Sequence, residues 1–252
     1  MGMFKSGNAV ISEKTFQNLA VTDPSNVMTV RGALNKTGFL FLMLIAGAVF
    51  SWYKFEKDPQ SAITLMWVGA IGGLILCLII SFKKQTAPYL APAYGILEGL
   101  FVGAISAYYN FAFAAKMPNI IFNAVGLTIG AALAMFLLYR FKLIKATAKF
   151  RSIIFTATAG IAIFYVIVLV LRLCGVNVGF MHDSSLLGIG LSLFIVAIAA
   201  LNLILDFDMI EYGAANNAPK YMEWYSAFGL LVTVIWLYLE ILRLLSRFAS
   251  RN

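Results

Sequence analysis

The residues of this sequence best able to carry chemistry are a few acidic, basic and amide side chains set within long apolar segments. An ionisable group at the centre of a membrane span costs about 2.5 to 3.5 kcal/mol on insertion scales unless it is paired or hydrated. Such groups therefore mark places where protons or cations are bound and passed on. The residues concerned are Glu98, Asn202, Asp206, Asp208, Glu211, Glu240 and Arg243.

Helical geometry sorts the acidic residues near the end of the sixth apolar segment. Successive residues of an α-helix are about 100° apart, so positions three or four apart share a face. Asn202 and Asp206 share one face, and Asp208 and Glu211 share another. At most one of the two aspartates can therefore look squarely into a helix bundle.

Glu240, in the last apolar segment, is the candidate partner of one of these aspartates. Two carboxylates in a poorly solvated site share a proton as the pH falls, so their titrations are coupled. When ionised, carboxylate oxygens attract a hard cation such as Ca²⁺. The pattern predicts a pH-sensitive cation path, with Asp206 and Glu240 as candidate Ca²⁺ contacts.

Each of these side chains also has a purely structural interpretation. Arg243 lies three residues after Glu240 and can neutralise it by a salt bridge within one helix. Asp208 and Glu211 can lie at a solvated helix end, and Glu98 can be a hydrogen-bonded packing residue. The residues alone leave these alternatives open.

Composition places the chain in the membrane. Of its 252 residues, 62% are hydrophobic and 12% are charged, whereas about a quarter of the residues in soluble domains are charged. This excludes an ordinary soluble enzyme and a disordered chain, and the continuous apolar runs disfavour an outer-membrane barrel. The net charge of +8 comes from residues at segment ends, without the aromatic-interleaved basic patch that nucleic-acid binding requires. We expect an all-helical, polytopic membrane protein.

Seven apolar segments are long enough to cross a bilayer. We expect a polar N-terminal segment over 1–36 and a seven-helix transmembrane domain over 37–248. Short connections leave no soluble domain, so any chemistry lies within the bundle or at its mouths. The predicted spans are 37–53, 61–82, 89–113, 119–139, 152–174, 186–210 and 224–245.

Glycines recur at four-residue spacing in two of these spans. This spacing places them on one helical stripe, where backbones can approach closely. We therefore predict close helix packing at both stripes, which are Gly95, Gly99 and Gly103, and Gly126 and Gly130.

The distribution of lysine and arginine predicts the orientation. Twelve of these residues lie in segments on the same side of the membrane as the N-terminus, and seven lie on the opposite side. The side with more positive charge is cytoplasmic, so the N-terminus is predicted to be cytoplasmic. Seven full spans leave three arginines, among them Arg243, on the external side. Either Arg243 faces the bundle, or the last segment is re-entrant.

Three segments resemble a known family. They are the run Leu-Glu-Gly-Leu-Phe-Val-Gly-Ala-Ile-Ser at 97–106, the acidic end of the sixth span, and Leu-Tyr-Leu-Glu-Ile-Leu-Arg-Leu-Leu at 237–245. They resemble the bacterial branch of the Bax inhibitor-1 (transmembrane Bax inhibitor motif) family, over about 33–248. The resemblance implies a seven-helix bundle with its last helix near the centre. It also implies an acidic pair that senses pH and gates a Ca²⁺ leak, in the bacterial inner membrane.

Within that resemblance, Glu240 matches the second acid of the sensor pair, with Glu in place of the usual Asp. The first acid matches either Asp206 or Asp208. We favour Asp206, because it shares a face with Asn202 and lies deeper.

The sequence departs from the family pattern in two ways. The link from Asp206 to Glu240 is 34 residues, longer than the family leads us to expect. The second span also lacks the arginine that latches the first acid in some relatives. Either the sensor chemistry is altered, or the latch comes from Lys83, Lys84 or Arg243.

The leading hypothesis is a pH-sensitive Ca²⁺ or cation leak channel. Asp206, Glu240 and Asp208 are the candidate sensor and gate, and Glu98, Glu211 and Asn202 are candidate pore or ion contacts. The alternative is an interaction protein that binds and modulates a membrane protease or another membrane complex, with segment 1–36 as its docking piece.

Catalysis is disfavoured, although two intramembrane acids are also found in aspartyl proteases. The chain lacks the Gly-x-Gly-Asp segment of such membrane proteases, and it has no His-Glu-x-x-His, Walker loop, Gly-x-Ser-x-Gly or Cys-x-x-Cys motif. We expect no enzyme activity and no cofactor. The expected partners are the lipid bilayer, and Ca²⁺ or protons as bound or transported ions.

Overall fold

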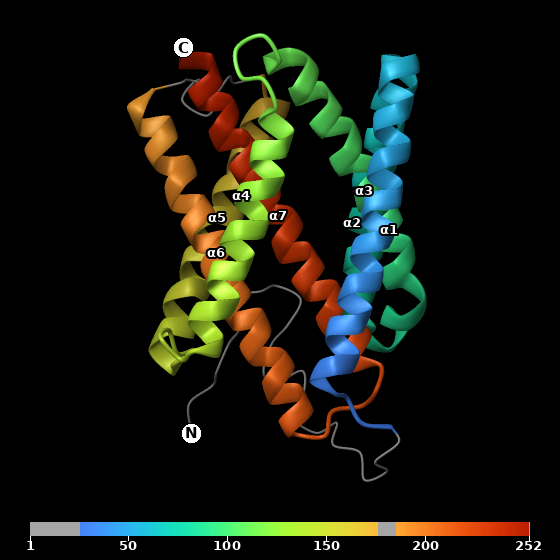
Figure 1. Cartoon of the computed structure of the whole chain (residues 1–252), viewed down its shortest axis with the longest axis vertical. Helices are drawn as coiled ribbons and strands as arrows, with labels where there is room; N and C mark the ends of the chain where they lie inside the picture. The colour runs from blue at the N-terminus through green and yellow to red at the C-terminus, as the bar shows by residue number, and fades with distance from the viewer. Residues whose placement is uncertain (1–25, 176–184, 252) are drawn as a thin grey trace.

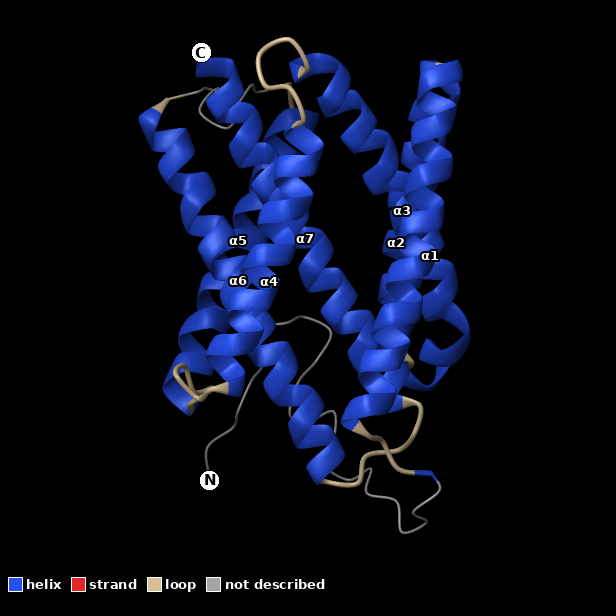
Figure 2. Ribbon diagram, viewed as in Figure 1, coloured by secondary structure: helices blue, strands red, loops and turns tan. Residues whose placement is uncertain are grey.

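The computed structural model describes residues 26–175 and 185–251, and this part of the chain is a bundle of seven long helices (Figures 1 and 2). Each of the seven is long and apolar enough to cross a membrane, which confirms the predicted fold class. The elements are α1 (Val30–Lys57), α2 (Pro59–Phe82), the 3-10 turn η3 (Lys84–Thr86), α3 (Ala87–Phe113), α4 (Ile120–Arg140), α5 (Ala148–Leu173), α6 (Leu186–Ala215) and α7 (Met222–Arg251).

Several helices begin earlier than their apolar runs, because polar caps set their first turns. Thr29 accepts a hydrogen bond from the Gly32 N–H, so α1 begins seven residues before the predicted span. Thr147 caps α5 in the same way through Phe150. Such caps satisfy backbone donors that the first turn leaves unpaired. Of the predicted polar segment 1–36, residues 1–25 lie outside the described residues, and the rest includes the start of α1.

Helix α7 is the central element of the bundle. It packs against α1, α3, α4 and α6, and Figure 1 shows it in red between the α1–α3 group and the α4–α6 group. Its 30 residues make it about 45 Å long, and it ends at the opposite end of the bundle from the start of α1. The last segment is therefore one continuous helix that is long enough for a full crossing, which favours the alternative in which Arg243 faces the bundle.

The predicted glycine packing holds at one stripe and fails at the other. A Cβ at Gly99 would overlap the Leu44 carbonyl, and one at Gly103 would overlap the backbone of Ala48, so α3 and α1 are in backbone contact. At Gly126 and Gly130, a Cβ would meet nothing within 4 Å in the described part of the chain. Only the α3 stripe is a packing seam.

We expect Gly99→Ala to destabilise the bundle by about 1 to 3 kcal/mol, because the new methyl group forces α1 away from α3. The matched control is Gly130→Ala, also within a helix but in open space, which we expect to be neutral or slightly stabilising. Thermal unfolding in detergent micelles measures both. Equal melting temperatures for the two variants would contradict backbone contact at Gly99.

Candidate functional site

Three polar side chains of α5 lie along one stripe and reach two acids and an amide of the neighbouring helices. Arg151, Thr158 and Tyr165 are spaced seven residues apart, which is close to two helical turns, so they point in nearly the same direction. The adjacent stripe of α5 is apolar, and Ile154 and Ile161 pack there in a cluster with residues of α6. The face of α5 toward the bundle is therefore half polar and half apolar.

The first polar link joins α5 to the end of α6. Arg151 forms an ion pair with Asp208, and the Tyr139 hydroxyl of α4 donates to Glu211 at 2.7 Å. A pocket of about 350 Å³ opens here, lined by these acids and by basic residues such as Lys142. Asp208 and Glu211 therefore have protein partners, whereas the structural interpretation placed them at a solvated helix end.

The second link lies deeper, at Asn202. Its amide Nδ2 donates to Thr158 Oγ1 at 2.9 Å and to the Ile198 carbonyl at 2.8 Å. Its buried Oδ1 accepts no hydrogen bond within the described residues. Asp206 lies one turn further along α6, on the same face as predicted, and is completely buried. Two buried oxygen-bearing groups thus lie one turn apart.

The third link joins α5 to α7. The Glu240 carboxylate, 2% exposed, accepts from the Tyr165 hydroxyl at 2.7 Å and from Trp236 Nε1 at 3.3 Å. Arg243 pairs with the same carboxylate at 2.9 Å and also donates to the Tyr165 hydroxyl. The salt bridge within one helix is therefore present, and Arg243 faces the bundle.

The structure does not bring Asp206 and Glu240 together. Asp206 lies nine residues before the end of α6, and Glu240 lies eighteen residues after the start of α7. Asp206 is thus about 13 Å from the end of α6 and Glu240 about 27 Å from the start of α7, and the partners of Glu240 are Tyr165, Trp236 and Arg243. Within the described ranges, no group of three or more His, Cys, Asp or Glu side chains could hold a metal ion. Each carboxylate has its own surroundings, and the predicted shared pair is not formed.

The remaining predicted residues lie elsewhere in the bundle. Glu98 is half-buried on α3, hydrogen-bonded by Tyr94 and packed against Gly73 of α2. Lys83 is exposed at the end of α2, and Lys84 Nζ lies 5.7 Å from the ring centre of Tyr225. Of the three candidate latches, Arg243 pairs with a predicted sensor acid, Glu240.

Sequence analysis missed a completely buried acid at the start of α7. Glu223 forms an ion pair with Lys36 of α1 and accepts from the N–H and hydroxyl of Thr29, both at 2.9 Å. It precedes the apolar run of its helix, and although Lys220 lies 3.9 Å from its carboxylate, Lys36 and Thr29 are nearly 200 residues away in sequence, so no local pattern predicts its burial. The polar stripe of α5 could have been found from the sequence, because its three polar residues are spaced seven residues apart.

Comparison with known proteins gives one match. A family model described as Bax inhibitor 1 like matches residues 8–250, which spans almost all of the seven helices. No curated protein and no solved structure matches the chain.

We expect Glu223→Ala to lower the free energy of unfolding by about 3 kcal/mol, because it leaves the half-buried Lys36 ammonium without its partner. Glu56→Ala, which removes an exposed carboxylate on α1, is the matched control and should change it by about 0.5 kcal/mol or less. Denaturant unfolding in micelles compares them. A loss for Glu223→Ala no larger than that of the control would show that the clamp between α1 and α7 contributes nothing.

Proposed function

The chain belongs to the Bax inhibitor 1 like family of membrane proteins, and from this premise we propose that it conducts Ca²⁺ or another cation passively, through a path that acidification opens. One observation carries the proposal. The buried face of α6 holds Asp206 and the Asn202 Oδ1, one turn apart inside a membrane-spanning helix. Carboxylate and amide oxygens are the ligands that hard cations prefer, and buried acceptors in a span typically mark an ion pathway.

Helix α5 is the natural gate for such a path. It packs mainly on α6 through a small apolar cluster and is held by the links at Arg151, Thr158 and Tyr165. One of these, Thr158 to Asn202, lies directly at the proposed path. Movement of α5 away from α6 would uncover the Asn202 amide and the adjacent Asp206.

Protonation biases this gate through the two outer links. A proton on Asp208 removes the charge that pairs with Arg151, and Tyr139 and Glu211 are the other polar groups there. Likewise, a proton on Glu240 removes the charge that faces Arg243 and weakens its acceptance from Tyr165 and Trp236. Both changes weaken the hold on α5, so a two-state helix packing shifts toward the open state as the pH falls.

We expect Ca²⁺ flux into proteoliposomes to rise as the pH is lowered from about 8 to about 5, because a proton on either carboxylate removes the charge that pairs with its arginine. Glu240→Gln, which mimics the protonated acid, should raise flux at neutral pH by about tenfold, the effect of losing one charged hydrogen bond of about 1.4 kcal/mol. It should also flatten the pH profile. Unchanged flux with an unchanged profile would contradict the gate.

Thr158→Val is the matched control for the gate, because it breaks a link to α5 that contains no titratable group. We expect it to raise flux at every pH while the shape of the pH profile remains. If Thr158→Val flattened the profile as Glu240→Gln does, the pH dependence would not come from the carboxylate link.

Asp206→Asn tests the path itself rather than the gate. We expect flux to fall at all pH values, by about tenfold for the loss of one charged ligand, with α5 still responding to pH. Absence of Ca²⁺ flux from the unmodified protein at every pH would overturn the proposed conduction altogether.

A further inference from the structure

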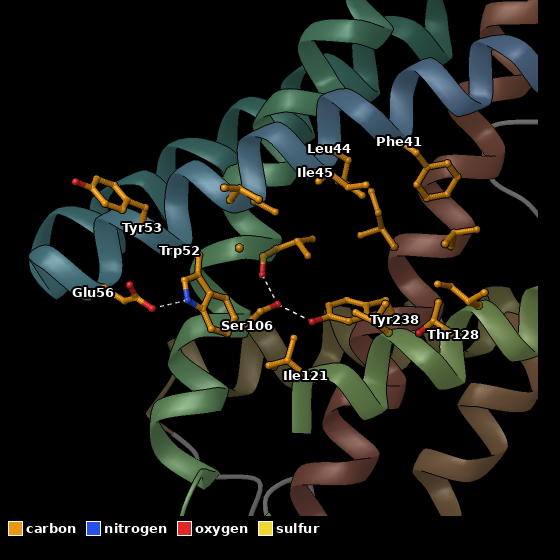
Figure 3. Close-up of a pocket in the computed structure, with 18 residues that line it drawn as sticks. Phe41, Leu44, Ile45, Trp52, Tyr53, Glu56, Ser106, Ile121, Thr128 and Tyr238 are labelled. Carbon is orange, nitrogen blue, oxygen red and sulfur yellow. Dashed lines mark hydrogen bonds between the residues drawn. The ribbon is translucent and has the colours of Figure 1, made fainter. Parts of the chain in front are cut away.

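A large apolar groove opens on the side of the bundle between α1 and α4, away from the α5 stripe. Its volume is about 610 Å³. The rim residues are exposed and the floor residues are buried (Figure 3). The rim includes Ile45 and Val49 of α1 and Val125 and Ile129 of α4; the floor includes Val102 and Ser106 of α3 and Ile235 and Tyr238 of α7.

The chemistry of the floor fits a hydrocarbon occupant. Its polar atoms already have partners: the hydroxyls of Ser106 and Tyr238 are 2.6 Å apart, Ser106 donates to the Val102 carbonyl, and Thr128 donates to the Ala124 carbonyl. An occupant would therefore find apolar surface and no unpaired donor or acceptor on these side chains. Because α1 and α4 both have the length and composition of membrane spans, the groove opens toward lipid.

One end of the groove has the character of a membrane interface. Trp52, Tyr53 and Glu56 line it near the end of α1, and Lys57 in the last turn lies over the Tyr53 ring at 5.6 Å. Aromatic rings and lysines of this kind lie at the level of lipid headgroups. From Phe41 to Glu56 the groove follows α1 for about 22 Å, more than the roughly 15 Å of one leaflet's hydrocarbon.

We propose that this groove is a binding site for one bilayer phospholipid, whose acyl chain lies between α1 and α4 and whose phosphate lies near Lys57. The volume decides between a lipid chain and a transmembrane helix of a second copy or another protein. A helix about 22 Å long and about 10 Å across occupies roughly 1,700 Å³, nearly three times the space available. An acyl chain is slender enough to enter. The site lies apart from the α5 gate and does not depend on conduction.

The test uses the full-length protein in vesicles that contain a phospholipid with a diazirine on its acyl chain. After irradiation, peptide mass spectrometry locates the labelled residues. We expect labelling to concentrate on the groove and to drop about tenfold there, equivalent to about 1.4 kcal/mol of binding, when Val49→Trp and Ile129→Trp together fill it. The matched control, Leu42→Trp with Leu127→Trp, adds the same bulk to exposed positions of α1 and α4 outside the groove and should leave labelling unchanged.

A second measurement tests the groove without introducing tryptophan side chains into it. Native mass spectrometry of the delipidated wild-type protein should show one retained phospholipid, and Lys57→Glu should reduce its retention severalfold, because the reversed charge repels the phosphate. Labelling spread evenly over all lipid-facing helices would overturn the proposal. Equal labelling of the filled variant and its control, or photocrosslinks that join two protein copies through Val49, would overturn it as well.

Discussion

The cost of placing charged groups inside membrane-spanning helices is the constraint on which this bundle depends. Water is absent from the hydrocarbon core, so each buried acid needs a donor from the protein. Glu240 and Asp208 obtain theirs from Arg243 and Arg151, and Glu223 obtains its own from Lys36. The Glu240 pair lies within α7, whereas the Glu223 pair connects α7 with α1 and the Asp208 pair connects α6 with α5, so these two contacts both neutralise charge and join neighbouring helices.

The pairing divides the molecule into a rigid part and a looser part. On one side, α1 and α3 meet backbone to backbone at Gly99 and Gly103, and the Glu223 cluster ties α1 to the start of α7. On the other side, α5 is attached by a few isoleucines and three polar side chains. Close packing is lost all at once when helices separate, whereas single hydrogen bonds are lost one at a time. The proposed movement of α5 would therefore cost less free energy than separating α1 from α3.

Hydropathy was sufficient to predict the seven spans and their order, because a bilayer requires long apolar helices whatever their neighbours are. The salt bridge between Glu240 and Arg243 was also within reach, since both partners lie three residues apart on one helix. The relative level of Asp206 and Glu240 along the bundle could not be predicted from the sequence. It depends on where α6 ends and α7 begins, and these bounds are set by the turn between the two helices. Glu223 illustrates the same limit, since its partners come from the other end of the chain.

The separation of Asp206 from Glu240 changes how such a protein can sense pH. Two unit charges in contact at about 4 Å interact by about 4 kcal/mol at an effective dielectric constant of about 20, and the interaction falls as the charges are moved apart. Glu240 forms its ion pair with Arg243 of the same helix, so its charge is neutralised without Asp206. Glu240 responds mainly to Arg243 and Tyr165, which touch it directly. In the proposed gate, protonation breaks a link that holds α5, and the movement of α5 then uncovers the Asn202 amide and Asp206 to a cation.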